Sequence, residues 1–471
     1  MFELHHLTAQ EQWDWLQRGD VTPTELAEHY LARIERLNPT LGAFTTVTAD
    51  GARRRAEQLE NQSSRSAPLW GLPFGDKDLS RRAGVRTTFG SRLFENLVPD
   101  TSDEIVEVMD AAGGVSLGKT STPEFGLSSY TESLVAPPAR TPWDLSRSAG
   151  GSSGGAAVAV SAGLLPFAPG SDGGGSIRIP AAATGLVGLK PSRGLVPAST
   201  GLDKLAGLVT SGPLARTVAD AAMLLDAMIG GGPYPFAVRA PRWDGGALLN
   251  AAARGEGRFQ LGVMTTSPWD DAYDITIATE ARDALSATVI ELAAIGHGLE
   301  EIALDKDDSF PTAFRTIWQA GAASIPAEGA EIDLLEPLTR WLVARGRELS
   351  GRQLGDALLA LSTYERSIIR QFSSFDAILT PALALTPRPV GWYNADDGEA
   401  NFAQQVQYTP FASFVNASGL PAITLPVAQT AEGLPMGVQL IGRPGGEHVL
   451  LAIGAQLERR FNWQRRHPPQ W

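Results

Sequence analysis

Residues 149–180 read AGGSSGGAAVAVSAGLLPFAPGSDGGGSIRIP, with two runs of glycine and serine on either side of an apolar segment. The apolar segment predicts a helix over residues 155–163 and a short strand over residues 164–168. A flexible Gly/Ser linker between domains would lie in polar, solvated sequence, which is not the case here. Both runs are therefore predicted to lie inside the fold, next to the ends of buried elements.

The second run could hold a negatively charged oxygen. Gly173, Gly174, Gly175 and Ser176 supply four consecutive small residues whose N–H groups can form a concave anion-binding nest. A serine at the end of such a nest lies beside an oxyanion hole made by its own loop. Ser176 is therefore a candidate nucleophile, while close packing between backbones is the competing explanation of the glycines.

A nucleophilic serine needs a base, and the residues alone leave its identity open. The six histidines, which are His5, His6, His29, His297, His448 and His467, all lie far from both runs in the sequence. One hypothesis is an α/β-hydrolase, in which GSSGG at 151–155 presents Ser153 as nucleophile and His297 or His448 follows as base. Another takes Lys77 as base, because a lysine in a poorly hydrated site loses its proton more easily. An exposed Lys77 paired with a neighbouring aspartate is the structural alternative.

Strand and helix patterns alternate along the whole chain. Thr22, Pro23 and Glu25 predict the start of a helix that ends at Asn38-Pro39. The segment 68–74 should enter the core and deliver Lys77 at its end. Further helices are predicted over 103–112, 216–229, 277–295 and much of 306–370, strands over 115–118, 377–379, 423–427 and 438–441, and surface loops over 231–247 and 388–404. This order predicts an α/β fold in a single large domain, with a mixed, twisted β-sheet covered by helices on both faces.

Composition narrows the function classes. The chain has 471 residues, a formal net charge of −13 and no cysteine. The negative charge disfavours nucleic acid and anionic membranes as partners, and the lack of cysteine removes disulfides, thiolate metal sites and a cysteine nucleophile. We find no secretory signal and no apolar run long enough to span a bilayer, so we expect a soluble, cytoplasmic protein. The scattered histidines lead us to expect no metal and no organic cofactor.

Three segments together resemble the amidase signature family. They are residues 72–78 around Lys77, residues 150–155 around Ser152, and residues 174–180 around Ser176. The family spaces its lysine, first serine and second serine as this chain does, with 75 residues from Lys77 to Ser152 and 24 from Ser152 to Ser176. Residues 416–422 and 437–442 extend the resemblance. It implies one amidase domain over 1–471, with a signature core at about 68–200 and a variable helical substrate-pocket region at about 306–370.

The resemblance implies a mechanism without metal or cofactor. Ser176 attacks the carbonyl and forms an acyl-enzyme, while Ser152, which follows a cis peptide bond, passes the proton to neutral Lys77. Gly173, Gly174 and Gly175, together with Gly126 and Ser128 of the segment 125–132, are expected to form the oxyanion hole or to contact substrate. Ser153 is expected to orient its neighbours. Asp172 and Arg178 are expected to form a structural charge pair or to anchor the loop.

Two positions depart from the family pattern. Asp76 stands where an aliphatic residue is usual, and its carboxylate is expected to point away from Lys77, since it would otherwise stabilise the charged form of the base. Gly173 replaces a usual Thr or Ile, which removes bulk near the scissile carbonyl. Phe314, Trp318, Leu335 and Trp341 either line an apolar pocket or pack in the core.

Members of the family that this chain resembles include fatty acid amide hydrolase, peptide amidases, urethanases and one component of the glutamyl-tRNA amidotransferase. We expect an amidohydrolase that acts on linear, neutral, hydrophobic or aryl amides, or on related carbamates or esters. Its substrate would be a small molecule, and a homodimer is the assembly that we consider. The alternative is the glutamine-hydrolysing subunit of a tRNA-dependent amidotransferase, which would bind a partner and tRNA. The absence of an acidic residue between Tyr408 and Val415 weighs against it. A binding protein with a degenerate site is disfavoured because all three catalytic positions are intact.

Overall fold

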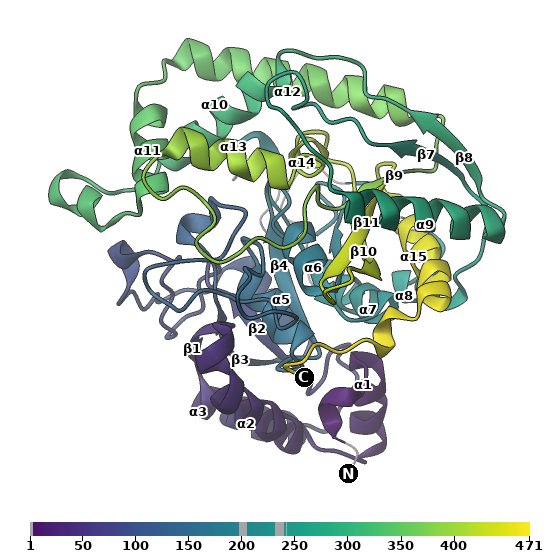
Figure 1. Cartoon of the computed structure of the whole chain (residues 1–471). Helices are drawn as coiled ribbons and strands as arrows, with labels where there is room; N and C mark the ends of the chain where they lie inside the picture. The colour runs from purple at the N-terminus through teal and green to yellow at the C-terminus, as the bar shows by residue number, and fades with distance from the viewer. Residues whose placement is uncertain (1–2, 197–204, 231–239, 242) are drawn as a thin grey trace.

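The strands of the chain form two β-sheets in the computed structural model, which describes residues 3–196, 205–230, 240–241 and 243–471. The smaller sheet has the order β1-β3-β2, in which β1 (Phe44–Val47) is antiparallel and β2 (Pro73–Lys77) parallel to β3 (Val115–Thr120). It lies with the N-terminal helices at one end of the molecule (Figure 1).

The larger sheet has eight strands in the order β4-β6-β5-β10-β11-β9-β7-β8. Its strands β7, β8 and β9 run parallel, while the pairs from β4 through β11 to β9 are antiparallel, so the sheet is mixed. The strands are β4 (Phe167–Asp172), β5 (Val187–Lys190), β6 (Thr210–Ala215), β7 (Gln260–Met264), β8 (Gly298–Ile302), β9 (Ala377–Pro381), β10 (Ala422–Gln429) and β11 (Pro435–Gly442).

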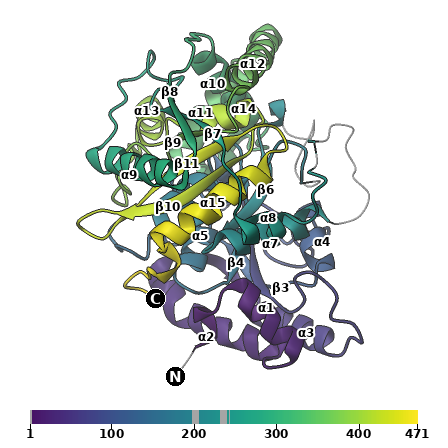
Figure 2. The same ribbon diagram turned by 90° about the vertical axis from the view of Figure 1, so that its right-hand side faces the viewer.

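Helices cover both faces of the large sheet. Thr424 of β10 pairs with Gly188, where an added Cβ would meet Ala181 of α6, whereas a Cβ added to Gly454 of α15 would meet the adjacent Leu425. Because neighbouring residues of a strand point to opposite faces, α6 packs on one face and α15 on the other, where α7 and α9 join it. Figure 2 shows α7, α8, α9 and α15 together on the near side. The predicted α/β fold, with helices on both faces of a mixed sheet, is confirmed; the small second sheet was not predicted.

Fifteen α-helices lie in the described part of the chain. They are α1 (Ala9–Arg18), α2 (Pro23–Leu41), α3 (Ala49–Glu60), α4 (Glu104–Ala111), α5 (Gly154–Ser161), α6 (Arg178–Thr184), α7 (Val218–Ile229), α8 (Leu248–Arg254), α9 (Thr279–Ile295), α10 (Phe310–Ala323), α11 (Pro337–Arg347), α12 (Gly351–Phe372), α13 (Gly398–Tyr408), α14 (Ser413–Ala417) and α15 (Glu447–Phe461). The helices α10 to α13 gather at the end of the molecule opposite α1 to α3 (Figure 1).

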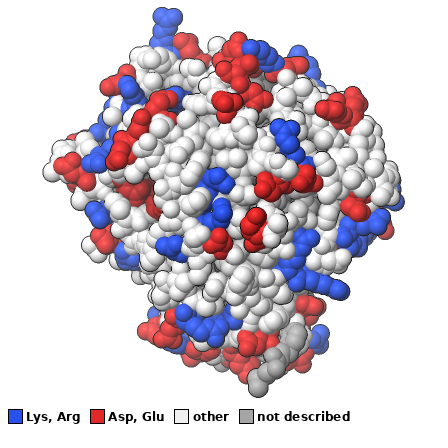
Figure 3. Space-filling model, in the orientation of Figure 1, with Lys and Arg blue, Asp and Glu red and all other residues white. Residues whose placement is uncertain are grey.

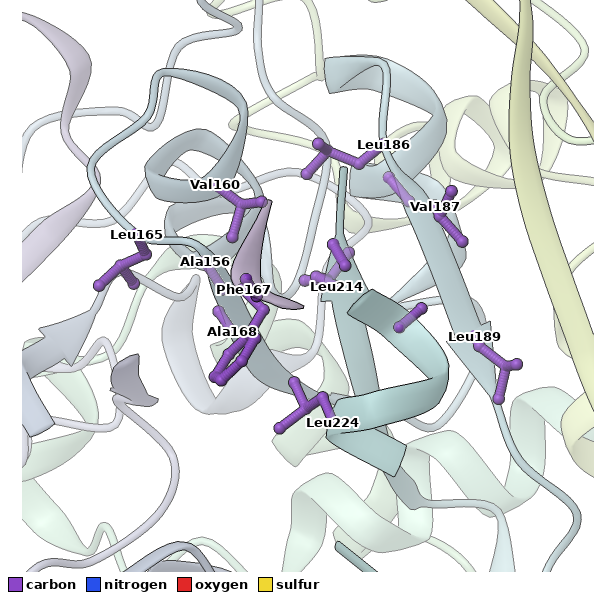
Figure 4. Close-up of a cluster of buried hydrophobic side chains, with 14 of the residues drawn as sticks. Ala156, Val160, Leu165, Phe167, Ala168, Leu186, Val187, Leu189, Leu214 and Leu224 are labelled. Atoms are coloured by element: carbon purple, nitrogen blue, oxygen red, sulfur yellow. The ribbon is translucent and has the colours of Figure 1, made fainter. Parts of the chain in front are cut away.

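Helix α5 lies at the centre of the core. Its sequence is apolar or small all round, and each of its residues is buried, as expected for a helix without a polar face. Figure 4 shows its Ala156 and Val160 beside Phe167 and Ala168 of β4, with Leu214 of β6 close by. The segment that precedes α5 is therefore held by the centre of the fold.

Several predicted boundaries were wrong. Helix α2 continues past Pro39 to Leu41 and ends where Gly42 adopts φ 65°, because Asn38 still accepts a backbone hydrogen bond from Gly42. The strand predicted over 164–168 begins at Phe167 and runs to Asp172. In the segment 388–404, which was predicted to be a loop, α13 begins at Gly398 because Asp397 caps it through the amides of the first turn. Of the loop predicted over 231–247, residues 231–239 and 242 lie outside the described residues, as do 197–200 at the end of the signature core.

Figure 3 shows the distribution of charged side chains on one face of the molecule. On the face in Figure 3, acidic and basic side chains are interspersed, and neither sign forms one continuous patch. None of the helices in the described ranges has both the length and the apolar character that a bilayer crossing requires.

Candidate active site

Three chain segments bring Lys77, Ser152 and Ser176 to the same cavity. Lys77 is the last residue of β2, Ser152 lies just before α5, and Ser176 lies in the loop between β4 and α6. The Lys77 Nζ lies 2.8 Å from the Ser152 Oγ, and all three side chains line a cavity of about 890 Å³. The sequence-predicted residues are therefore brought together, although 75 and 24 residues separate them along the chain.

Lys77 is held in a dry environment. Its side chain is 3% exposed, and burial lowers its pKa from 10.5 to about 7, although the charge of Asp172 acts in the opposite direction. The Nζ also lies 3.2 Å from the carbonyl oxygen of Ser171 and 3.0 Å from the Ser171 Oγ. Sequence reasoning missed Ser171, although it lies in the second glycine run, because only the packing of β2 beside β4 brings it to Lys77.

Asp76 points away from Lys77, as predicted. Its carboxylate accepts a hydrogen bond from the Arg82 Nε at 2.6 Å and another from the Ser116 Oγ at 2.7 Å. Adjacent residues of a strand project to opposite sides, so a buried aspartate can precede the lysine without sharing its environment. The departure from the family pattern therefore leaves the lysine without a neighbouring carboxylate from its own strand.

The backbone around Ser152 is tightly enclosed. The Gly151–Ser152 peptide bond is cis, as the family resemblance implied. Gly126 adopts φ 69°, and a Cβ added to it would lie 3.2 Å from the Ser152 Oγ. A glycine is therefore needed at Gly126 both for its backbone conformation and for the close approach of the serine.

Ser153 bonds to the backbone on both sides of the site. Its N–H donates to the carbonyl oxygen of Ser176 at 3.0 Å, and its hydroxyl donates to the carbonyl oxygen of Ser171 at 3.3 Å. These contacts agree with the expected orienting role. They tie the segment before α5 to the loop that carries Ser176.

A buried ion pair anchors that loop. The Asp172 carboxylate accepts hydrogen bonds from the N–H groups of Gly175 at 2.7 Å and Ile177 at 3.2 Å, and from the Arg178 Nε at 3.0 Å. Burial would raise the pKa of Asp172, but the charge of Arg178 outweighs it and holds that pKa well below its usual range. Asp172 and Arg178 therefore form a buried charge pair within the loop that carries Ser176.

The same contacts correct the prediction of four available amides. The Gly175 N–H is used by Asp172, and its φ of 124° favours glycine for conformational reasons. Within the described residues, no hydrogen bond uses the N–H groups of Gly173, Gly174 or Ser176. These three amides, rather than four, remain free to bind an oxyanion.

Two further polar residues complete the network, and the sequence analysis assigned them no role. The Asn416 Nδ2 donates to the Asp172 carbonyl and carboxylate at 2.8 and 2.9 Å, and the Arg178 guanidinium donates to the side-chain oxygens of Asn416 and Gln439, each at 2.6 Å. Both lie in the segments 416–422 and 437–442, where an amide side chain interrupts an apolar run. That interruption is the signal that could have identified them, because buried amides require partners.

The histidines of the α/β-hydrolase hypothesis lie elsewhere. The His297 ring bonds to Gln456 at 2.7 Å and to the N–H of Phe259, and the His448 ring stacks on Trp243 with ring centroids 4.9 Å apart. Neither ring lines the cavity at Ser176. The alternative with Ser153 as nucleophile and a histidine base is therefore wrong.

A second, smaller cavity of about 60 Å³ also reaches Ser176. Ser128, whose hydroxyl donates to the Tyr130 carbonyl at 2.8 Å, lines this cavity, whereas Gly126 lines the large one. Of the four apolar residues considered from sequence, Trp318 lines both cavities and Phe314 lines the small one. Leu335 and Trp341 line neither and pack among the apolar side chains of α10 and α11.

The described part of the chain contains no group of three or more histidine, aspartate or glutamate side chains arranged to hold a metal ion. Around Ser176 the two cavities present serine hydroxyls, the Lys77 amine and free backbone amides. Such groups suit nucleophilic attack on a carbonyl.

Comparisons with known proteins match this chain over most of its length. The family model for Amidase matches residues 25–451. AmiB2 of Mycobacterium tuberculosis is 37% identical over 96% of both chains, and a glutamyl-tRNA(Gln) amidotransferase subunit of Roseiflexus sp. is 33% identical over 99% of this chain and 98% of its own. A solved structure of 6-aminohexanoate cyclic dimer hydrolase in complex with substrate superimposes with a TM-score of 0.91 and 31% identity, covering 99% of both chains.

Proposed function

This chain belongs to the amidase family and is a hydrolase of C–N bonds, and on that premise we propose that it cleaves neutral amides through Ser176, Ser152 and Lys77. The observation that carries the proposal is the 2.8 Å contact between the Lys77 Nζ and the Ser152 Oγ, in a buried site that opens on Ser176. Related carbamates and esters present the same carbonyl to the nucleophile and fall within the proposal.

Lys77 acts as the base in its neutral form. A neutral amine has two N–H donors and one lone pair. If the two N–H groups donate to the carbonyl and hydroxyl oxygens of Ser171, the lone pair faces the hydroxyl of Ser152. Burial supports this state, since it lowers the pKa of Lys77 to about 7.

The reaction then proceeds in two halves. The Ser176 Oγ bonds to the carbonyl carbon, its proton passes to Ser152, and the proton of Ser152 passes to Lys77. The C–N bond breaks as the relay returns a proton to the leaving nitrogen, which departs as an amine. Water next attacks the acyl-enzyme and loses a proton to the relay, and the Ser176 oxygen takes a proton back as the carboxylic acid leaves. The free amides of the nucleophile loop stabilise the oxyanion in both halves.

Two observations favour a neutral substrate over glutamine. Arg81, which lines the large cavity, pairs with Asp103 at 2.7 Å, so its guanidinium is not left to bind the carboxylate of glutamine. The segment from Tyr408 to Val415 contains no acid to hold an amino group. Resemblance to the Roseiflexus amidotransferase keeps the glutamine-hydrolysing function as the second candidate.

Labelling with a fluorophosphonate tests the nucleophile. We expect one adduct, which mass spectrometry places on Ser176. We expect Ser176→Ala to lose labelling and to lose turnover of aryl amides by about 10⁴-fold or more, with an unchanged melting temperature. The matched control, Ser153→Ala, should retain labelling. An adduct on Ser153, or glutamine hydrolysed faster than every aryl amide, would contradict the proposal.

A further inference from the structure

Two cavities of unequal size meet at Ser176. The large one holds about 890 Å³ and the small one about 60 Å³, and Leu127, Ser176 and Trp318 line both. The Trp318 Nε1 donates to the Leu127 carbonyl oxygen at 3.2 Å. This contact joins helix α10 to the segment after β3, and because both residues line both cavities, it forms a partition between them.

The partition stands over the loop that carries Ser176. A Cβ added to Gly173 or Gly174 would lie 3.7 Å from the Trp318 ring, and at Gly174 it would lie 3.5 Å from Phe314. The Phe314 and Trp318 rings stack on each other, with centroids 5.5 Å apart and an angle of 17° between their planes. The glycines therefore leave room for the stacked rings of Phe314 and Trp318 against the loop.

The residues of the proton relay line only one of the two cavities. Lys77 and Ser152 line the large cavity and do not belong to the lining of the small one. The leaving nitrogen must receive its proton from this relay, so the amine half of the substrate has to lie on the relay side. The acyl group is bonded to the other side of the carbonyl carbon and points away from the amine.

We propose that the small cavity is the acyl subsite and that Trp318 sets its size, so that the enzyme prefers amides of short, apolar acyl groups on large amines. Trp269, Phe314, Trp318, Phe402 and Val406 supply apolar walls for the acyl group. A volume of about 60 Å³ accommodates only a few non-hydrogen atoms, since one water needs roughly 10–15 Å³ on the same scale. This proposal rests on the proposed function, because it assumes attack by Ser176.

Two series of anilides test the assignment. In the first, the acyl group grows from acetyl through butanoyl to octanoyl on a constant aniline; in the second, a constant acetyl group is carried on aniline, naphthylamine and larger aryl amines. We expect kcat/KM of the wild type to fall at least about tenfold from butanoyl to octanoyl, since about 1.4 kcal/mol of lost acyl-group binding is tenfold in rate. In the amine series we expect a change of no more than a few-fold.

Variants of tryptophan test the partition. Trp318→Ala should join the two cavities and reduce the preference for butanoyl over octanoyl by about tenfold or more. Trp318→Phe keeps a ring stacked on Phe314 and should retain the preference. Comparison of the two variants shows whether the change in Trp318→Ala comes from the lost partition or from a general loss of packing. The matched control is Trp341→Ala, because Trp341 lies on the adjacent helix α11 and lines neither cavity. It should leave the ratio unchanged.

The outcomes separate this proposal from the proposed function. If Ser176 is labelled by the fluorophosphonate and turnover is insensitive to acyl length but sensitive to amine size, the acyl subsite is wrongly assigned. An unchanged acyl preference in a folded Trp318→Ala protein would equally overturn the role of Trp318. If Ser176 takes no label and its alanine variant turns over substrate, the proposed function fails first.

Discussion

Two helical glycines show how differently the centre and the periphery of this protein tolerate change. Gly155 lies in α5, and a Cβ added there would lie 2.2 Å from the Ser121 nitrogen and 2.4 Å from the Ala43 oxygen. Gly355 lies in α12, and an added Cβ would meet nothing within 4 Å. The first glycine is required by the approach of other backbones, while the second is not required by any described contact.

The difference extends to the two regions that contain these helices. The catalytic framework, defined as residues 73–77 and 150–178 with Asn416 and Gln439, is held by hydrogen bonds between segments far apart in the sequence. The helical wall, defined as residues 310–372, is held mainly by apolar packing. Hydrogen-bonded buried groups demand specific partners, whereas apolar contacts accept many side chains of similar volume. We therefore expect the framework to determine the chemistry and the wall to determine the substrate.

The largest expected effect is the loss of the base in the framework. Lys77→Ala should reduce kcat/KM for an aryl amide by about 10³- to 10⁵-fold, because the serines lose their proton acceptor. Lys77→Arg should not restore activity, since a guanidinium stays protonated at any working pH. Steady-state kinetics on folded protein measure both changes.

Lys190 provides the control for this substitution. It is fully buried at the end of β5, burial lowers its pKa to about 7, and its Nζ donates to the Pro191 carbonyl oxygen. It lines neither cavity. Lys190→Met should therefore change kcat/KM only a few-fold, and a loss as large as that of Lys77→Ala would show that burial of a lysine, rather than its position, is what matters.

The loop anchor should show the next largest effect. Asp172→Asn leaves Arg178 buried without its counter-ion and should lower the free energy of unfolding by about 3–5 kcal/mol. The comparison is Asp144→Asn, which breaks the partly exposed pair with Arg147 and should cost at most about 1 kcal/mol. Urea unfolding of both variants measures the difference. Equal losses would mean that the buried pair does not anchor the framework.

The pH dependence of activity should follow Lys77. Because the neutral amine is the active form and its pKa is lowered to about 7, kcat/KM should rise about tenfold per pH unit below this value and level off above it. The lowered pKa of Lys77 also makes the folded protein more stable as pH rises from about 7 toward 10.5. The cost of burying the charged amine is full below about pH 7 and disappears as pH rises toward 10.5, since the unfolded chain then binds more protons than the folded one.

A profile that rises only near pH 10 would contradict the neutral base. The Ser171→Ala variant refines the measurement, because it removes a hydroxyl that lies 3.0 Å from the Lys77 Nζ. It should move the midpoint of the profile while leaving the melting temperature nearly unchanged. A Ser362→Ala variant on the exterior of α12 should move neither.

The smallest expected effect lies in the wall. Gly355→Ala should raise the free energy of unfolding by about 0.5–1 kcal/mol, since alanine favours the helix and nothing obstructs its methyl group. Gly155→Ala should instead destabilise the protein, because two backbones would have to move apart. If both variants behaved alike in thermal unfolding, the contrast between framework and wall would be wrong.

Local sequence determined the parts of this protein that depend on neighbouring residues. The capping box of Thr22 and Glu25 starts α2 as predicted, and the apolar segment 156–160 forms a buried helix. The strand before Lys77 enters the core, and the family spacing identified Lys77, Ser152 and Ser176 as one group. These features could be predicted because capping, periodicity and spacing are expressed within a few residues or repeat across related chains.

Tertiary structure decided the features that depend on which segments meet. Ser171 reaches Lys77 because β4 lies beside β2, and Asn416 reaches Asp172 across 244 residues. The Gly175 N–H is used by Asp172, so the number of free amides in the loop could not be read from the glycines themselves. Trp318 lines both cavities, whereas Trp341, which is also a tryptophan and lies on the next helix, lines neither. Each outcome follows from distances between segments, and those are set only when the chain has packed into its three-dimensional fold.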